Sequence, residues 1–313
     1  MTATSDSRLG RIVAVVGPTA VGKTAVAEEI ASLVNGEIVS ADSMQVYRGM
    51  DIGTAKPPVG ERRAPYHCLD IVDPGEPYSA ALFQRDAREA IDGIIARGRV
   101  PIVCGGSGLY VRAALDDMRF PDGEVRSAVR EHLDALARDL SPQELHARLA
   151  SIDPASAAVI HPANVKRIVR VLEMAGQGVS YAQRLPGFQR RESVYDAVFV
   201  GLSMDRPELY ERIGERVDAM ISSGLIEEVR GLLDRGFRTA LTASKAIGYK
   251  EIVPVLEENA DLPTAIDTIK QSTRRYAKRQ LSWFHADPRV DWVDVTGLSP
   301  VSAVERVVML VDF

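Results

Sequence analysis

The stretch GPTAVGKT, from Gly17 to Thr24, has the spacing G-x-x-x-x-G-K-[ST] of a phosphate-binding loop. The apolar run Arg11–Val16 comes before it, and Val26, Ile30 and Leu33 recur at helical spacing after it. Between a strand and a helix, the backbone N–H groups of such a loop surround a phosphate while its lysine meets outer phosphate oxygens. We predict such a site, which would bind either ATP or a ligand that carries a diphosphate. It consists of Gly17, Pro18, Thr19, Ala20, Val21, Gly22, Lys23 and Thr24.

Short β-rich runs alternate with helical patterns along the chain. Besides Arg11–Val16, the runs typical of buried parallel strands are Glu37–Ala41, Pro101–Gly105 and Tyr195–Leu202, with His67–Val72 and a late edge strand at Trp292–Val295 as shorter candidates. Helical patterns cover Leu82–Ile95 and the chain after Arg206. This alternation predicts an α/β fold with a P-loop-type, doubly wound, mostly parallel sheet.

The β signal disappears between Pro121 and Pro186, where Ala, Leu, Arg and Glu are abundant. The turn sequences PDG and LPG bound this part of the chain. We therefore predict a helical insertion domain over residues 121–186. Residues 1–120 and 187–313 are expected to form the α/β core, with helices toward the C-terminus.

Composition limits the classes of function. The chain of 313 residues has a formal charge of −5 and a pI near 5.7, so a polyanion would have to meet local basic faces. Its two cysteines stand singly in apolar stretches, and its five histidines lack metal-binding spacing, which predicts reduced core cysteines and no structural zinc. The N-terminus does not resemble a signal peptide, and no apolar run reaches ~18 residues. We expect a cytoplasmic protein without membrane segments.

Two helical patterns have a basic side opposite an apolar side. In NVKRIVRVLEM the basic residues are Lys166, Arg167 and Arg170, opposite Val165, Ile168, Val169 and Leu172. Between Ile266 and Phe284 they are Lys270, Arg274, Arg275, Lys278 and Arg279, opposite Ile266, Ile269, Tyr276, Trp283 and Phe284. One such face is usually just solvated, but two in an acidic protein favour a polyanion that spans both.

Ligands of an open α/β sheet bind at the carboxyl ends of its strands. Asp42 follows the second predicted strand, GGSGLY (Gly105–Tyr110) follows another, and Asp205 follows a third, so we expect all of them near Lys23. The spacing of Asp42 fits a turn or helix-cap aspartate equally well. GGSGLY by itself also fits an ordinary strand-to-helix turn.

The combination of motifs resembles the bacterial tRNA dimethylallyltransferase family. GPTAVGKT, DSMQVYRGMDIGTAKP, GGSGLY, HPANVKRIVRVLEM and TRRYAKRQLSWF occur in order from about Ile12 to Phe284, nearly the whole chain. The resemblance implies transfer of a dimethylallyl group from dimethylallyl diphosphate to N6 of the adenosine 3′ of the anticodon in tRNA. The products would be N6-dimethylallyladenosine and diphosphate.

The resemblance also implies roles for single residues. It makes Gly17–Thr24 the diphosphate site and Asp42 the general base. The chemistry of the loop adds Mg²⁺ as the cofactor, with the Thr24 hydroxyl as a ligand. The implied catalytic residues are Asp42, Lys23, Thr24 and Arg216, with Arg212 one helical turn from Arg216. The implied tRNA contacts are Asp42, Ser43, Met44, Gln45, Ser107, Arg126, Lys166, Arg167, Arg170, Lys245, Gly248, Tyr249 and Lys250. To these the helical projection adds Lys270, Arg274 and Lys278, and we expect a monomer.

Three rival functions use the same motifs. Phosphate-binding loops of this kind most often hold nucleoside triphosphates, so a small-molecule kinase with Asp205 or Asp73 as the magnesium-associated acid is the first. The second is a non-catalytic RNA-binding protein with a nucleotide site. The third is a prenyltransferase acting on free AMP, which would not need extended basic helices.

Overall fold

The computed structural model describes residues 11–120 and 128–311, which fall into two compact units. One consists of residues 1–116 and 193–313, and the other of residues 117–192. These boundaries differ from the predicted 121 and 186. The N–H of Asp117 donates to the carbonyl of Glu192 at 2.9 Å, which joins the two ends of the second unit. Pro186 lies inside a helix, so the expected turn at LPG is wrong.

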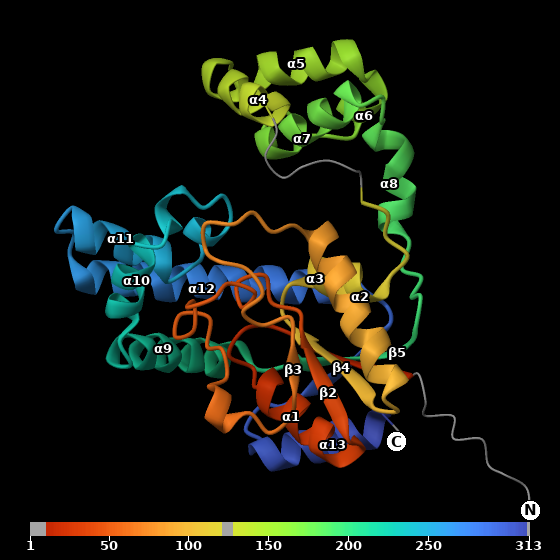
Figure 1. Cartoon of the computed structure of the whole chain (residues 1–313), viewed down its shortest axis with the longest axis vertical. Helices are drawn as coiled ribbons and strands as arrows, with labels where there is room; N and C mark the ends of the chain where they lie inside the picture. The colour runs from red at the N-terminus through yellow and green to blue at the C-terminus, as the bar shows by residue number, and fades with distance from the viewer. Residues whose placement is uncertain (1–10, 121–127, 312–313) are drawn as a thin grey trace, which may run out of the picture. The chain divides into compact units, whose positions relative to one another are not determined.

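The first unit contains a six-stranded sheet in the order β3-β2-β4-β1-β5-β6. Figure 1 labels β2, β3, β4 and β5 of this sheet. Every strand pairing in it is parallel, which confirms the predicted fold class. The strands are β1 (Arg11–Val16), β2 (Gly36–Ser40), β3 (Tyr66–His67), β4 (Val100–Gly105), β5 (Asp196–Ser203) and β6 (Val290–Asp294). β6 is at the edge, as predicted.

The third strand is much shorter than the predicted His67–Val72. Cys68 and Asp70 have φ angles of 61° and 55°, which are left-handed and incompatible with an extended strand. Val72 makes one isolated bridge with Tyr47 instead.

Helices cover both faces of this sheet. α1 and α13 pack on one face and α2 and α3 on the other (Figure 1). Val13, Val15 and Ile30 are fully buried in the core beneath α1 and α13, whereas Leu33 of the predicted apolar stripe is 60% exposed. The bounds of these helices are α1 (Lys23–Val34), α2 (Ala80–Ala96), α3 (Gly108–Leu115) and α13 (Pro300–Val311).

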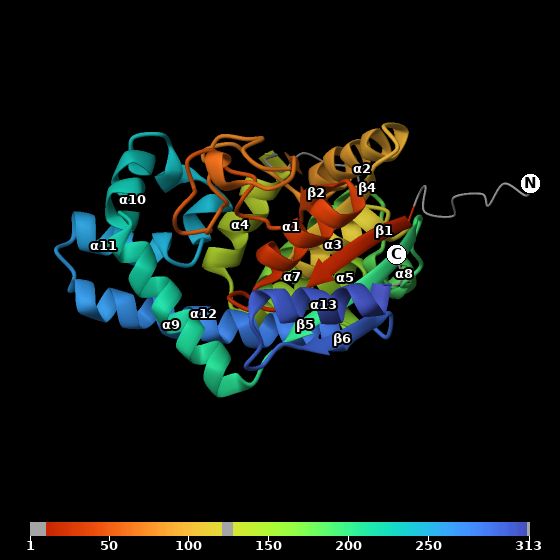
Figure 2. The same cartoon turned by 90° about the horizontal axis from the view of Figure 1, so that it is seen from below.

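Four helices in the C-terminal half of the chain form a second layer of the same unit. Figure 2 shows α9 running beside α12, with α10 and α11 packed next to them. Ile269, Ala277 and Phe284 form the buried side of α12. The bounds are α9 (Arg206–Ser222), α10 (Leu225–Leu233), α11 (Tyr249–Glu257) and α12 (Leu262–His285), with single 3-10 turns at Val59–Glu61, Phe237–Thr239 and Ala243–Lys245.

The described elements of the second unit are helices. They are α4 (Ala128–Asp139), α5 (Pro142–Ile152), α6 (Pro154–Ala158), α7 (Val165–Gly176) and α8 (Tyr181–Gln189). Leu145, Leu149 and Ile168 are fully buried in its own core. Ser141 and Glu144 form a reciprocal capping box that fixes the start of α5. Within residues 11–120 and 128–311, no helix combines the length and apolar character needed to cross a membrane.

Candidate active site

Three loops meet where β1, β2 and β4 end. The phosphate-binding loop follows β1, Asp42 follows β2, and Ser107 follows β4. The N–H of Ser107 donates to the carbonyl of Ala41 at 3.3 Å, and the N–H of Ser43 donates to Ser107 Oγ at 3.1 Å. The parallel sheet thus brings Asp42 and GGSGLY together at its carboxyl edge, as the strand order requires.

The phosphate-binding loop is fixed from two sides. Gly17 has a φ of 140°, and a Cβ there would lie 2.6 Å from the carbonyl oxygen of Leu202. From α12, buried Gln280 accepts the N–H of Thr19 at 2.9 Å and donates to the carbonyl of Gly106 at 3.0 Å. Gln280 was missed in the sequence, although a glutamine on the apolar side of a helix signals a buried polar contact.

A small chamber of about 70 Å³ lies over this loop, and Lys23, Thr24, Asp42, Cys104 and Arg216 are among the residues that line it. Lys23 Nζ donates to the carbonyl of Pro18 at 2.6 Å. The pKa of Lys23 is lowered to about 8, mainly by burial and also by Arg216, while Cys104 and Asp42 act in the opposite direction. A partly dehydrated cation at the N-terminus of a helix is suited to a phosphate ligand.

A wider cavity of about 460 Å³ adjoins this chamber. The residues that line both are Thr19, Asp42, Thr54, Arg216 and Tyr276. The wider cavity also has a concentration of cations that contrasts with the acidic chain as a whole. They are Lys245, Lys250, Arg275 and Arg279 in addition to Arg216. Asp42 therefore lies at the junction of a phosphate-sized chamber and a large basic cavity.

The structure distinguishes between the two candidate arginines of α9. Arg216 lines both cavities and donates to the carbonyl of Thr54 at 3.4 Å. Burial lowers the pKa of Arg216, and Asp42 opposes this effect. Arg212 instead pairs with Glu208 at 2.9 Å. Arg216 is thus the arginine of the candidate site.

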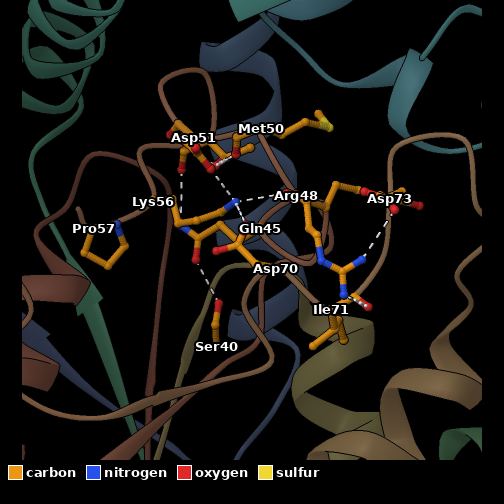
Figure 3. Close-up of polar contacts among 12 residues, drawn as sticks. Ser40, Gln45, Arg48, Met50, Asp51, Lys56, Pro57, Asp70, Ile71 and Asp73 are labelled. Carbon is orange, nitrogen blue, oxygen red and sulfur yellow. Dashed lines mark hydrogen bonds and ion pairs between the residues drawn. The ribbon is translucent and has the colours of Figure 1, made fainter. Parts of the chain in front are cut away.

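The segment after β2 is held by its own polar contacts, shown in Figure 3. The ammonium of buried Lys56 contacts Asp51 and Asp70, each at 2.5 Å, and donates to the carbonyl of Tyr47 at 2.9 Å. These contacts fold the segment back on itself. Lys56, near the end of the motif DSMQVYRGMDIGTAKP, therefore has a structural role.

Asp42 and Gln45 also help to shape this segment. Asp42 Oδ1 accepts the N–H of Met44 at 2.8 Å, as the interpretation of Asp42 as a turn residue predicts. The same residue also lines both cavities. Gln45 accepts from Ser40 Oγ at 2.8 Å and donates to the carbonyl of Thr54 at 3.2 Å. Ser43 and Met44 line the wider cavity and Gln45 the smaller.

The other residues of the predicted tRNA set lie in different places. Lys245, Gly248, Tyr249 and Lys250 all line the wider cavity. In the second unit, Lys166 and Arg167 are exposed on α7, while Arg170 pairs with Glu173 at 2.5 Å. Arg126 lies outside the described residues.

The predicted open basic face of α12 is wrong in part, because α9 packs against it. Lys270 pairs with Asp218 at 2.7 Å, and the guanidinium of Arg274 lies 5.3 Å from the ring centre of Tyr210, both on α9. Lys278 is exposed. Tyr276 lines the wider cavity beside Arg275 and Arg279 rather than opposite them. Trp283, expected on the buried side, is 42% exposed.

The acids proposed for a kinase do not face either cavity. Asp73 pairs with Arg235 at 3.1 Å and with Arg48 at 3.6 Å. Asp205 directly precedes α9, and its N–H donates to Thr296 Oγ1 at 2.8 Å, so the expectation that Asp205 joins the site is wrong.

Comparisons with known proteins agree on one family. The family model described as IPP transferase matches residues 45–287, and one described as isopentenyl transferase matches residues 10–64. The tRNA dimethylallyltransferase of Geobacillus thermodenitrificans is 49% identical over 290 residues, 91% of each chain. That of Desulforudis audaxviator is 46% identical, covering 95% of this chain and 96% of its relative.

Solved structures give the same result. The full-length tRNA isopentenylpyrophosphate transferase of Bacillus halodurans matches with a TM-score of 0.71 and 43% identity, covering 96% of this chain and 95% of that one. A eukaryotic dimethylallyltransferase acting on tRNA matches with a TM-score of 0.81 and 28% identity, covering 96% and 78%.

Proposed function

The chain belongs to the tRNA dimethylallyltransferase family, and we propose that it transfers the dimethylallyl group of dimethylallyl diphosphate to N6 of the adenosine 3′ of the anticodon in tRNA. The observation that carries this proposal is the meeting of the two cavities at Asp42 and Arg216. A kinase would place an acceptor next to a triphosphate with magnesium-binding acids, whereas Asp73 pairs with Arg235 and neither Asp73 nor Asp205 is among the residues that line the two cavities.

The diphosphate of the donor belongs in the chamber over the phosphate-binding loop. Lys23 supplies positive charge there, and the N-terminus of α1 supplies backbone N–H groups and a partial positive charge. Arg216 is next to this chamber and adds a second cation. These groups stabilise the negative charge that grows on the leaving diphosphate as the allylic C–O bond breaks.

The adenosine enters from the wider cavity. Arg275, Arg279, Lys245 and Lys250 surround its path with positive charge suited to RNA phosphates. The target base must leave its stack to reach Asp42, a step that costs a few kcal/mol and less in a loop than in a duplex.

In the transfer step, one bond forms as another breaks. The N6 lone pair forms a bond to C1 of the dimethylallyl group, and the electrons of the C1–O bond leave with diphosphate. The N6 proton passes to the carboxylate of Asp42, which acts as the general base. The products are N6-dimethylallyladenosine and diphosphate.

We propose Mg²⁺ as the cofactor. Thr24 is exposed and lines the chamber, and among the described residues no cluster of three or more His, Cys, Asp or Glu could hold a metal. This donor set fits Mg²⁺, which is usually held by few protein groups together with substrate phosphates and waters. When bound, Mg²⁺ would neutralise charge on the leaving diphosphate. We also propose that the protein is a monomer and acts in the cytoplasm on tRNA.

Incubation of unmodified tRNA with the protein, Mg²⁺ and dimethylallyl diphosphate tests the proposal. We expect mass spectrometry to show the gain of one dimethylallyl group in an anticodon-loop fragment without ATP. Transfer of the γ-phosphate of ATP to any acceptor, with no prenylated tRNA, would contradict it.

A further inference from the structure

Glu228, on α10, contacts the segment that follows β2 through an unusual set of hydrogen bonds. Its carboxylate accepts three successive backbone N–H groups, from Asp51 at 3.0 Å, Ile52 at 2.8 Å and Gly53 at 3.2 Å. It also accepts the hydroxyl of Tyr249 at 2.6 Å. Four donors thus converge on one carboxylate from two separate parts of the chain.

Two of the four residues that donate to Glu228 belong to the wall of the wider cavity. Gly53 and Tyr249 line it, and the ring of fully buried Tyr249 packs so closely on Gly53 that a Cβ there would lie 2.3 Å from Cε2. A side chain at position 53 would separate the two segments. Glu228 therefore bonds to two segments, Asp51–Gly53 and the start of α11 at Tyr249, that also pack closely against each other.

The contact extends to the junction of the two cavities. Residue 54 follows the three bound amides directly, and the carbonyl of Thr54 accepts from Arg216 at 3.4 Å and from Gln45 at 3.2 Å. A shift of the Asp51–Gly53 backbone would move this carbonyl. Arg216 would then lose its place beside Asp42.

We propose that Glu228 is a positioning residue for the acceptor side of the reaction, acting through the Asp51–Gly53 backbone, Tyr249 and Arg216. This role rests on the proposed tRNA prenyl transfer. The carboxylate is required rather than a polar side chain of the same size, because the amide of a glutamine would direct N–H groups at backbone N–H groups. The donor diphosphate is bound by Gly17–Thr24, which Glu228 does not contact.

The test compares Glu228→Gln with Glu227→Gln in the full-length protein. Glu227 is the adjacent residue, has a 69% exposed side chain, and pairs with Arg230 at 3.7 Å, so its substitution makes the same charge change on the outside of α10. For Glu228→Gln we expect kcat/KM for tRNA to fall roughly tenfold to a hundredfold, the scale of lost hydrogen bonds to a charged group. The KM for dimethylallyl diphosphate should stay within about twofold. Glu227→Gln should match the wild type.

Two further measurements separate positioning from general stability. Hydrogen exchange of the amides of Asp51, Ile52 and Gly53 should become faster in Glu228→Gln and not in Glu227→Gln. Tyr249→Phe, which removes one donor, should lower kcat/KM for tRNA too, and its effect should be less than additive with that of Glu228→Gln. Should Glu228→Gln fail to fold, Tyr249→Phe carries the same kinetic comparison.

The outcomes are distinct. A wild-type protein that yields no prenylated tRNA would overturn the proposed function and this role with it. A productive wild type together with unchanged tRNA kinetics in Glu228→Gln would overturn the positioning role alone. Equal losses for tRNA and donor, with a lowered melting temperature, would also overturn it in favour of a purely structural contact.

Discussion

Lys23 has an ammonium group whose charge changes close to physiological pH, because burial lowers its pKa to about 8. The protonated form binds a diphosphate, so donor affinity should be highest below this pKa and fall as pH rises through it. We expect the dissociation constant of dimethylallyl diphosphate, measured by calorimetry without tRNA, to rise by up to about tenfold per pH unit above pH 8. In Lys23→Arg the charge persists, so this rise should be absent. An equally flat wild-type profile between pH 7 and 10 would contradict the assignment.

Glu37 shows how a buried carboxylate in β2 affects stability. Burial by itself would raise its pKa, but hydrogen bonds from Arg97 and His67 outweigh this and lower the pKa to about 2. The stabilisation is therefore complete above the ordinary pKa of about 4.3 and is lost as pH falls toward 2.

Glu37→Gln should lower the free energy of unfolding by about 2 kcal/mol at pH 7, the scale of hydrogen bonds to a charged group. Urea unfolding at pH 7 and at pH 3 measures the difference, which should shrink at the lower pH. Glu29→Gln, which removes a surface pair with Arg63, should change little at either pH. A difference that grows on acidification would exclude this explanation.

The basic residues of helix α12 have two different roles: some line the wider cavity, and others contact α9. Arg275 and Arg279 are exposed and line the wider cavity, whereas Lys270 is paired with Asp218 of α9. The helical projection placed all of them on one face because it takes no account of the neighbouring helix. A helix that packs on two sides leaves a narrower solvent face than its sequence pattern predicts.

Arg279→Gln should therefore weaken tRNA binding, whereas Lys270→Gln should leave it nearly unchanged. Each lost phosphate contact should reduce the slope of log K against log salt by ~0.7 to 0.9. Filter binding between 50 and 200 mM salt gives both slopes. The reverse order of effects would place the RNA on the α9 side of α12.

The sequence predicts more of the elements than of their contacts. β1 matches its predicted bounds, β4 differs by one residue at its start, and β2 and β5 differ by one residue at each end, because buried parallel strands have a strong apolar signal. The left-handed backbone at Cys68 and Asp70, which shortened β3, has no such signal. Pro186 was read as a helix stop, yet it lies within α8.

At the scale of the whole molecule, the sequence predicts the positions of those site residues that follow strands of the sheet. Lys23, Asp42 and Ser107 follow strands of one parallel sheet, so their proximity follows from topology. Gln280, Glu228 and the choice of Arg216 over Arg212 depend on how the C-terminal helices pack on that sheet edge. Gln280 leaves one local signal, as a glutamine on the apolar side of a helix, whereas the other contacts leave no local pattern in the sequence.

We propose that C–N bond formation takes place at the junction of the two cavities, with Asp42 accepting the proton. The most direct measurement is the single-turnover rate of prenyl transfer to tRNA by Asp42→Asn, with the affinities for tRNA and donor measured in parallel. The amide keeps the shape of the side chain and cannot accept the N6 proton, so we expect the rate to fall by ~10²-fold or more while tRNA affinity stays largely intact. A single-turnover rate close to that of the wild type would contradict the claim and remove Asp42 from the chemical step.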